Sequence, residues 1–127
     1  LKKKGFFVEV DTRLAIVKVK VWGFWALEDG VAYLEEFKRA AQKVVGRPWY
    51  VLADISEFKA QKPEVSALVE QTMAFATSNG LAKAANLVSS SLGKVQIQRL
   101  SQAMGLPEFS FFQSEKQAIE WLLATAA

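Results

Sequence analysis

A strand buried on both faces is the feature that most constrains this fold. From Trp49 to Ile55 the sequence is apolar at every position except Asp54, without the alternation that marks a strand with one wet face. Strands of this kind lie inside sheets that carry helices on both sides. Asp54 and Ser56 end the run, which predicts polar groups at the strand end where open α/β sheets bind ligands.

Two strands are predicted before this segment. Residues alternate between two faces from Gly5 to Val10 and again from Leu14 to Trp22, which is the period of an extended chain. The short polar link between them suits a hairpin. Lys18 and Lys20 share one face of the second strand, so we expect part of that face to be wet.

Helical and extended segments alternate over the rest of the chain. The expected elements are a helix from about Leu27 to Val45, the strand Trp49 to Ile55, a helix from Pro63 to the Asn79-Gly80 stop, a strand from Ala84 to Val88, a helix from the serines Ser89 to Ser91 to Met104, a strand from Phe109 to Phe112, and a helix that opens at a Ser114/Gln117 capping box. The order β-β-α-β-α-β-α-β-α predicts a single-domain α/β fold with a mixed five-stranded sheet and four helices.

Length and composition narrow the class of protein. The 127 residues suit one domain, residues 1–127, with residues 1–4 as a flexible basic arm. No histidine or cysteine is present, which excludes thiolate chemistry and most transition-metal sites, and we expect no metal and no cofactor. The arm residues Lys2, Lys3 and Lys4 account for much of the net charge of +3, and the other basic residues are dispersed among acidic ones, so a nucleic-acid partner is not expected. No apolar run approaches a bilayer span, and we expect a cytoplasmic protein.

The carboxyl ends of the parallel strands are the best candidate site. Asp54, Ser56 and the serines Ser89, Ser90 and Ser91 follow strands that end at one edge of the predicted sheet. Backbone N–H groups and hydroxyls there suit a polar head group beside apolar walls. The alternative is that these residues cap loops and a helix and bind nothing.

An aromatic cluster follows the second strand. Trp22, Phe24 and Trp25 fall within four residues, and strand alternation prevents all three from entering one core. Trp22 and Trp25 are therefore candidates for lining a ligand groove or a partner surface. The alternative is that they cover the end of the helix layer, since each ring buries a large area.

The element order, the strand ending Val51-Leu52-Ala53-Asp54-Ile55-Ser56 and the helix after Lys62-Pro63 resemble the STAS domain, specifically the SpoIIAA-like group of small bacterial proteins. The resemblance covers Gly5 to Trp121. It implies a non-enzymatic binding domain related to anti-sigma-factor antagonists and, distantly, to the CRAL-TRIO lipid-transfer fold.

The same resemblance bears on a phosphorylation switch. The antagonists carry Asp-x-Ser, which Asp54-Ile55-Ser56 matches, and then a phosphorylated serine at the start of the next helix. Counted without gaps from Asp54, Glu64 takes the place of that serine. The nearest hydroxyl is Ser66, two residues later, and it is the remaining candidate phosphosite.

Two functions follow from these features. The first is a module that sequesters or carries a small apolar or amphipathic, lipid-like ligand at the Asp54 edge. The second is a protein-interaction domain of a regulatory complex or a homodimer, without the usual phosphoserine. An enzyme that uses Asp54 lacks a visible partner acid or base, so no catalytic residue is predicted.

Overall fold

Five strands and three helices lie within the residues that the computed structural model describes, 3–89 and 109–124. In chain order they are β1 (Gly5–Asp11), β2 (Ile16–Gly23), α1 (Leu27–Ala41), β3 (Trp49–Phe58), α2 (Pro63–Ser78), β4 (Leu81–Leu87), β5 (Phe109–Phe112) and α4 (Glu115–Leu123). Each of these eight elements has a predicted counterpart. The predicted third helix falls outside the described residues except for Ser89, and so do Ser90 and Ser91.

The strands form one sheet in the order β1-β2-β3-β4-β5. β1 and β2 are antiparallel, and each later neighbour pair is parallel, so the predicted mixed sheet is confirmed. Each parallel pair needs a crossover, and α1 and α2 supply two of them. The hairpin turn is anchored by Asp11, whose Oδ1 accepts a hydrogen bond from the backbone N–H of Leu14 at 2.9 Å.

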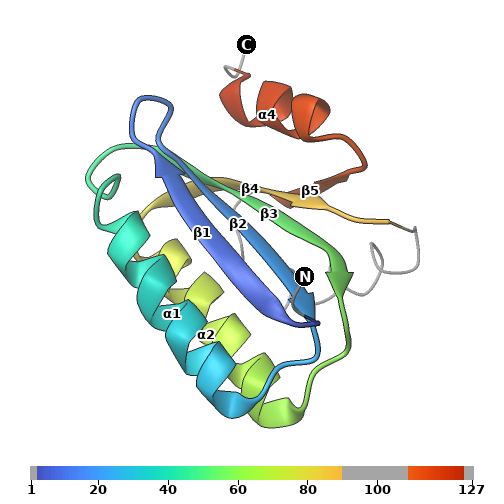
Figure 1. The fold of residues 1–127 in the computed structure, drawn as a ribbon. Coiled ribbons are helices and arrows are strands. Elements are labelled where there is room, and N and C mark those ends of the chain that lie inside the picture. Colours follow the sequence, from blue (N-terminus) through green and yellow to red (C-terminus); the bar gives the residue numbers. More distant parts are fainter. Residues whose placement is uncertain (1–2, 90–108, 125–127) are drawn as a thin grey trace.

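Helices lie on both faces of the sheet. α1 and α2 pack side by side against one face, and α4 lies on the other (Figure 1). α1 and α2 approach closely at Gly30, where a Cβ atom would come within 2.9 Å of the Leu68 side chain. Tyr33 and Phe37 of the same helix are buried in the core with residues of the sheet. Leu27 and Val31, two apolar residues of the same helix, are instead 48% and 42% exposed.

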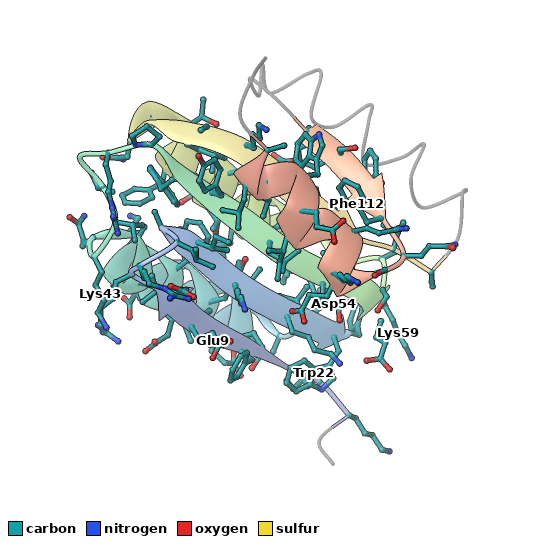
Figure 2. The ribbon with its side chains drawn as sticks, turned by 90° about the horizontal axis from the view of Figure 1, so that it is seen from above. Glu9, Trp22, Lys43, Asp54, Lys59 and Phe112 are labelled. Atoms are coloured by element: carbon teal, nitrogen blue, oxygen red, sulfur yellow. The ribbon has the colours of Figure 1, made fainter. Side chains whose placement is uncertain are left out.

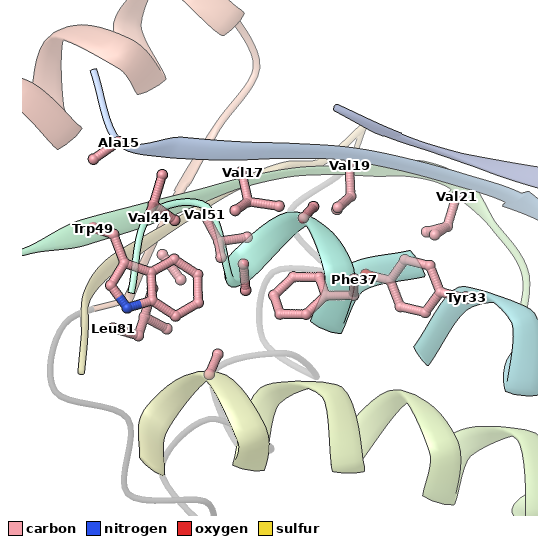
Figure 3. Close-up of a cluster of buried hydrophobic side chains, with 14 of the residues drawn as sticks. Ala15, Val17, Val19, Val21, Tyr33, Phe37, Val44, Trp49, Val51 and Leu81 are labelled. Atoms are coloured by element: carbon pink, nitrogen blue, oxygen red, sulfur yellow. The ribbon is translucent and has the colours of Figure 1, made fainter. Parts of the chain in front are cut away.

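The larger core lies between the sheet and α1 and α2 (Figure 3). Alternate residues of β2, Val17, Val19 and Val21, point into it. Opposite them, Phe37 contacts Trp49 and Tyr33 with ring centroids 6.3 and 6.2 Å apart. Burial raises the pKa of Tyr33 above its ordinary value because the phenolate would lose its hydration.

A smaller core lies under α4. Ala118 and Leu122 of the helix pack on Ile16, Leu52 and Ala85 of the sheet. The helix begins as predicted at Ser114, whose Oγ accepts a hydrogen bond from the backbone N–H of Gln117 at 3.4 Å. β3 thus contributes to both cores, which confirms that it is covered on both faces.

Several predicted boundaries are wrong. β2 starts at Ile16 rather than Leu14, and β4 runs from Leu81 to Leu87 rather than from Ala84 to Val88, because Leu81 already pairs with Trp49 of β3. α1 ends at Ala41 rather than Val45, because the chain tightens into turns in which Val44 and Val45 both donate to the Ala41 carbonyl. β3 continues to Phe58 rather than Ile55, because a register shift lets its polar end keep pairing with β2. The α2 boundaries agree with prediction, with Pro63 in the first turn and Gly80 at φ +88° after the end.

Candidate functional site

Part of the sheet face on the α4 side is uncovered. α4 packs on β3, β4 and β5, and β1 and β2 extend beyond it (Figure 2). We call the uncovered surface the open face; its residues are Phe7, Glu9, Lys18, Lys20, Trp22 and Asp54. Alternation along β1 and β2 places these side chains opposite the larger core, which confirms the wet face predicted from Lys18 and Lys20.

Charges on the open face are arranged across the strands. Glu9 pairs in register with Lys18, and Lys20 pairs in register with Asp54. The Lys20 Nζ lies 4.0 Å from Asp54 Oδ2 and 3.3 Å from Glu57 Oε2. Opposite charges that face each other across strands stabilise the sheet and hold the long lysine side chain in place.

Asp54 is held within the sheet rather than after it. On one side it pairs with Lys20, and on the other it is the last residue to pair with β4, opposite Leu87. Its Oδ1 accepts hydrogen bonds from the Ser56 backbone N–H at 3.1 Å and the Ser56 Oγ at 2.6 Å. β3 runs on to Phe58, so Ser56, which was expected to follow the strand, also lies within it.

Ser89, two residues after the end of β4, joins this group. Its Oγ donates to the Ser56 carbonyl oxygen at 3.3 Å, so the structure brings Asp54, Ser56 and Ser89 together as the sequence predicted. These hydrogen bonds are the local ones that Asp and Ser make in turns and caps. They account for the hydroxyl groups of Ser56 and Ser89 without a ligand.

A shallow hollow of about 170 Å³ lies between α4 and the open face. Its apolar lining includes Phe7, Leu52 and Leu87, and its charged lining includes Lys20 and Asp54. Glu115 at the start of α4 closes one side. This space corresponds to roughly six water molecules, far below the volume of a pocket for a drug-sized ligand.

The two predicted tryptophans have different environments. Trp22 lies on the open face, where its ring covers Gly5 across the strand pair; a Cβ atom on Gly5 would come within 2.7 Å of it. Trp25 is fully buried, and its Nε1 donates to the carbonyl oxygens of Gly5 and Trp22 at 3.2 and 3.1 Å. Trp25 therefore covers the end of the helix layer, one of the two predicted alternatives, and is outside the open face.

The candidate phosphosite positions lie on another surface. Glu64 is exposed in the first turn of α2, and Ser66 is half-buried in the same turn. The backbone N–H of Ser66 donates to the Lys62 carbonyl at 2.9 Å. Glu64 places a fixed negative charge at the helix N-terminus, where the helix dipole favours it.

Sequence reasoning missed Phe7 and Glu57. Phe7 is 51% exposed and is the largest apolar side chain on β1's open side. The alternation of Phe7 with Phe6 and Val8 indicates that Phe7 points to the opposite face of the sheet from these two residues. Periodicity does not indicate which part of that face α4 covers. Among the described residues, no cluster of three or more acidic side chains is suitable for a metal ion.

Comparison with known proteins identifies the fold. The structure matches the crystal structure of an uncharacterized DUF3478-family protein from Shewanella loihica PV-4, which has a SpoIIAA-like fold, with a TM-score of 0.80. The alignment covers 96% of this chain and 97% of the other at 15% sequence identity. This chain has a SpoIIAA-like fold. No family model matches its sequence, and no curated protein matches it.

The SpoIIAA-like fold confirms the fold that the STAS resemblance implied. At 15% identity the likeness concerns the arrangement of the elements and not the residues of the site. The described helices of this STAS-like chain include none with the length and apolarity needed to cross a membrane. Because the likeness is one of fold, the chemistry of the site follows from the side chains of this chain.

Proposed function

We propose that the chain is a non-enzymatic STAS-type interaction module that binds a partner protein on the open face. The single observation that carries this proposal is Phe7, an aromatic side chain 51% exposed on a regular strand beside ordered charges. Aromatic residues at the centre of a polar rim are typical of protein interfaces. The SpoIIAA-like fold supports a module that works by binding.

The charges of the open face specify what the partner should carry. Lys20 lies between Asp54 and Glu57, so these three side chains together carry one more negative charge than positive charge. A partner segment with an apolar side chain over Phe7 and a basic side chain near Asp54 would complement both features. The hydrogen bonds from Ser56 keep the Asp54 carboxylate oriented for such a contact.

Site-specific photo-cross-linking in the native host tests this proposal. A photoreactive amino acid replaces Lys20 on the open face or Glu70 on the exposed side of α2. We expect one discrete cross-linked protein from position 20 and not from position 70, and we expect Asp54→Arg to reduce its yield several-fold. Equal products from both positions, or an unchanged yield with Asp54→Arg at normal stability, would refute the open face as the binding surface.

A small amphipathic ligand is the second candidate function. The observation in its favour is the apolar lining of the hollow at Leu52 and Leu87 next to Lys20. Its volume of about 170 Å³ suits a short chain or a head group rather than a whole lipid. Native mass spectrometry of the purified protein would reveal a bound mass that Leu52→Trp removes; a bare protein mass in every preparation argues against this function.

A further inference from the structure

The outer edge of β1 is unpaired in the described part of the chain. β1 is the first strand of the sheet, and all seven of its residues pair with β2 on one side only. It contains no proline or lysine, and its pairing with β2 shows no bulge. Proteins normally protect an edge strand with such features because its free N–H and C=O groups are ready to pair with another chain.

The residues of β1 are complementary to a second copy in one antiparallel register. With Phe7 opposite the Phe7 of a second molecule, Phe6 faces Val8, and Glu9 faces Gly5. In this register the side chains on one face of β1 lie beside side chains on the same face of the second copy. The apolar side of each strand therefore continues across the join. An aromatic pair forms at the centre, and no two like charges face each other.

The residues flanking β1 extend this match. The same register places Lys3 of one molecule near Asp11 of the other, at both ends of the paired segment. Lys3 and Lys4 continue alongside the end of β2, because a Cβ atom on Gly23 would come within 2.3 Å of the Lys3 carbonyl oxygen. Shifting the register to bring Val8 opposite Val8 would instead place Lys3 near Arg13, two like charges.

A hollow is available for the incoming lysine. The space beside the hairpin measures about 370 Å³ and is lined by Glu9, Asp11, Arg13 and Lys18 among others. Asp11 accepts the Leu14 N–H with Oδ1, so its second carboxylate oxygen can accept from a lysine. The acidic pair Glu9 and Asp11 belongs to the edge strand itself, within reach of a side chain that arrives along that edge.

We propose that the chain forms a homodimer by antiparallel pairing of β1 with β1 of a second copy, centred on Phe7. The contact is isologous and closes on itself, so it yields dimers and no larger assembly. Two five-stranded sheets join into one continuous sheet, with both pairs of α1 and α2 on the same side. The two open faces then lie next to each other, which doubles the surface for a partner.

Sedimentation equilibrium of the full chain tests the dimer. Wild type should show twice the monomer mass, and Phe7→Lys should raise the dissociation constant more than about tenfold, because two lysines then face each other. Phe24→Lys is the matched control, since Phe24 is 48% exposed and lies outside β1, and it should remain dimeric. A monomeric wild type, or a Phe7→Lys variant as dimeric as wild type, overturns the proposal.

Cysteine cross-linking tests the register, because the natural sequence has no cysteine. Residues directly opposite on antiparallel strands lie within disulfide distance, so Phe7→Cys should form a covalent dimer on mild oxidation, and Phe24→Cys should not. A covalent dimer from Phe24→Cys alone, or none from Phe7→Cys, overturns the pairing. Lys20 is the register partner of Phe7, so the mass of the photo-cross-linked product at position 20 separates the two proposals: twice the chain mass reports the dimer, and any other mass reports a partner protein.

Discussion

The Gln61 side chain donates a hydrogen bond from Nε2 to the Gly23 carbonyl oxygen at 2.8 Å. The same amide group donates to the Lys59 carbonyl at 2.6 Å, and its Oε1 accepts the backbone N–H of Trp25 at 2.8 Å. One half-buried side chain thus joins the loop after β2 to the loop after β3. It fixes the chain just before α1 and holds Trp25 in the core.

Gln61→Glu should therefore destabilise the fold. A carboxylate keeps the acceptor for Trp25 but turns the donor into an oxygen that faces the Gly23 and Lys59 carbonyls. We expect a loss of about 2 kcal/mol in the free energy of unfolding, since two hydrogen bonds are lost and a carboxylate oxygen then faces the Gly23 and Lys59 carbonyl oxygens. Urea unfolding measures this loss. Gln71→Glu on the exposed side of α2 is the matched control, and an equal loss in both variants would contradict a role for the Gln61 contacts.

Position 23 also requires a glycine. It has φ +81°, and a Cβ atom there would lie within 2.7 Å of the Lys4 Cα atom. Gly46 also has a positive φ, +106°, but a Cβ atom there meets no other atom within 4 Å. Gly46→Ala should cost about 1 to 2 kcal/mol for backbone strain alone, and Gly23→Ala should cost more.

Thermal unfolding of the two alanine variants, with and without the residues before Gly5, separates strain from the steric clash. Removing Lys3 and Lys4 should reduce the cost of Gly23→Ala to that of Gly46→Ala. If the cost stays higher in the shortened chain, then contact with the N-terminal residues is not its cause.

The sequence predicted the sheet better than the site. β3 could be recognised because burial on both faces removes polar residues from Trp49 to Ala53, and α2 could be bounded because Pro63 and Gly80 have specific backbone geometries. Both signals are local. The end of β3 was missed because Ser56 and Glu57 look like loop residues, and only pairing with β2 keeps them extended.

The candidate site depends on contacts that periodicity does not encode. Asp54 and Ser56 were predicted correctly as neighbours of Ser89 because parallel strands end at one edge. Lys20 lies beside Asp54 because of the β2–β3 register, which no pattern within either strand determines. Trp25 is buried through contacts with Phe58 and Tyr33 from distant segments, so neighbouring residues alone did not decide between core and surface.

Lys83 connects α4 to the sheet. Its Nζ donates to the carbonyl oxygens of Trp121 and Ala124 at 3.0 and 3.2 Å and lies 5.0 Å from the Trp121 ring centroid. A positive charge at a helix C-terminus satisfies free carbonyls and favours the helix dipole. Lys83→Met should lower the free energy of unfolding by about 1 kcal/mol.

Hydrogen exchange of the α4 amides locates this effect. Protection should fall in Glu115–Leu123 more than in α1, and Lys116→Met, an exposed change on α4 itself, should leave it near the wild-type level. Unchanged exchange in the Lys83→Met variant would show that the apolar contacts of Ala118 and Leu122 are sufficient to hold the helix.

Lys4 and Asp29 make stability depend on pH. The Lys4 Nζ donates to Asp29 Oδ2 at 2.6 Å, and this bond, helped by the Ala26 backbone N–H, holds the pKa of Asp29 below its ordinary value of 3.8. Because the folded carboxyl binds its proton less readily than the unfolded one, its contribution is fully present above pH 3.8. It is lost as the pH falls through the lower folded pKa.

Lys4→Met should therefore raise the pKa of Asp29 toward 3.8, since the largest of the lowering interactions is removed. An NMR titration of the Asp29 carboxyl carbon measures this shift directly, and Lys43→Met, just beyond the far end of α1, should leave the pKa unchanged. The stability difference between wild type and Lys4→Met should be present at neutral pH and shrink on acidification, because a protonated Asp29 no longer distinguishes the two chains. A difference that persisted undiminished below the Asp29 pKa would mean that the lysine acts by packing its methylene groups against α1 and not through its charge.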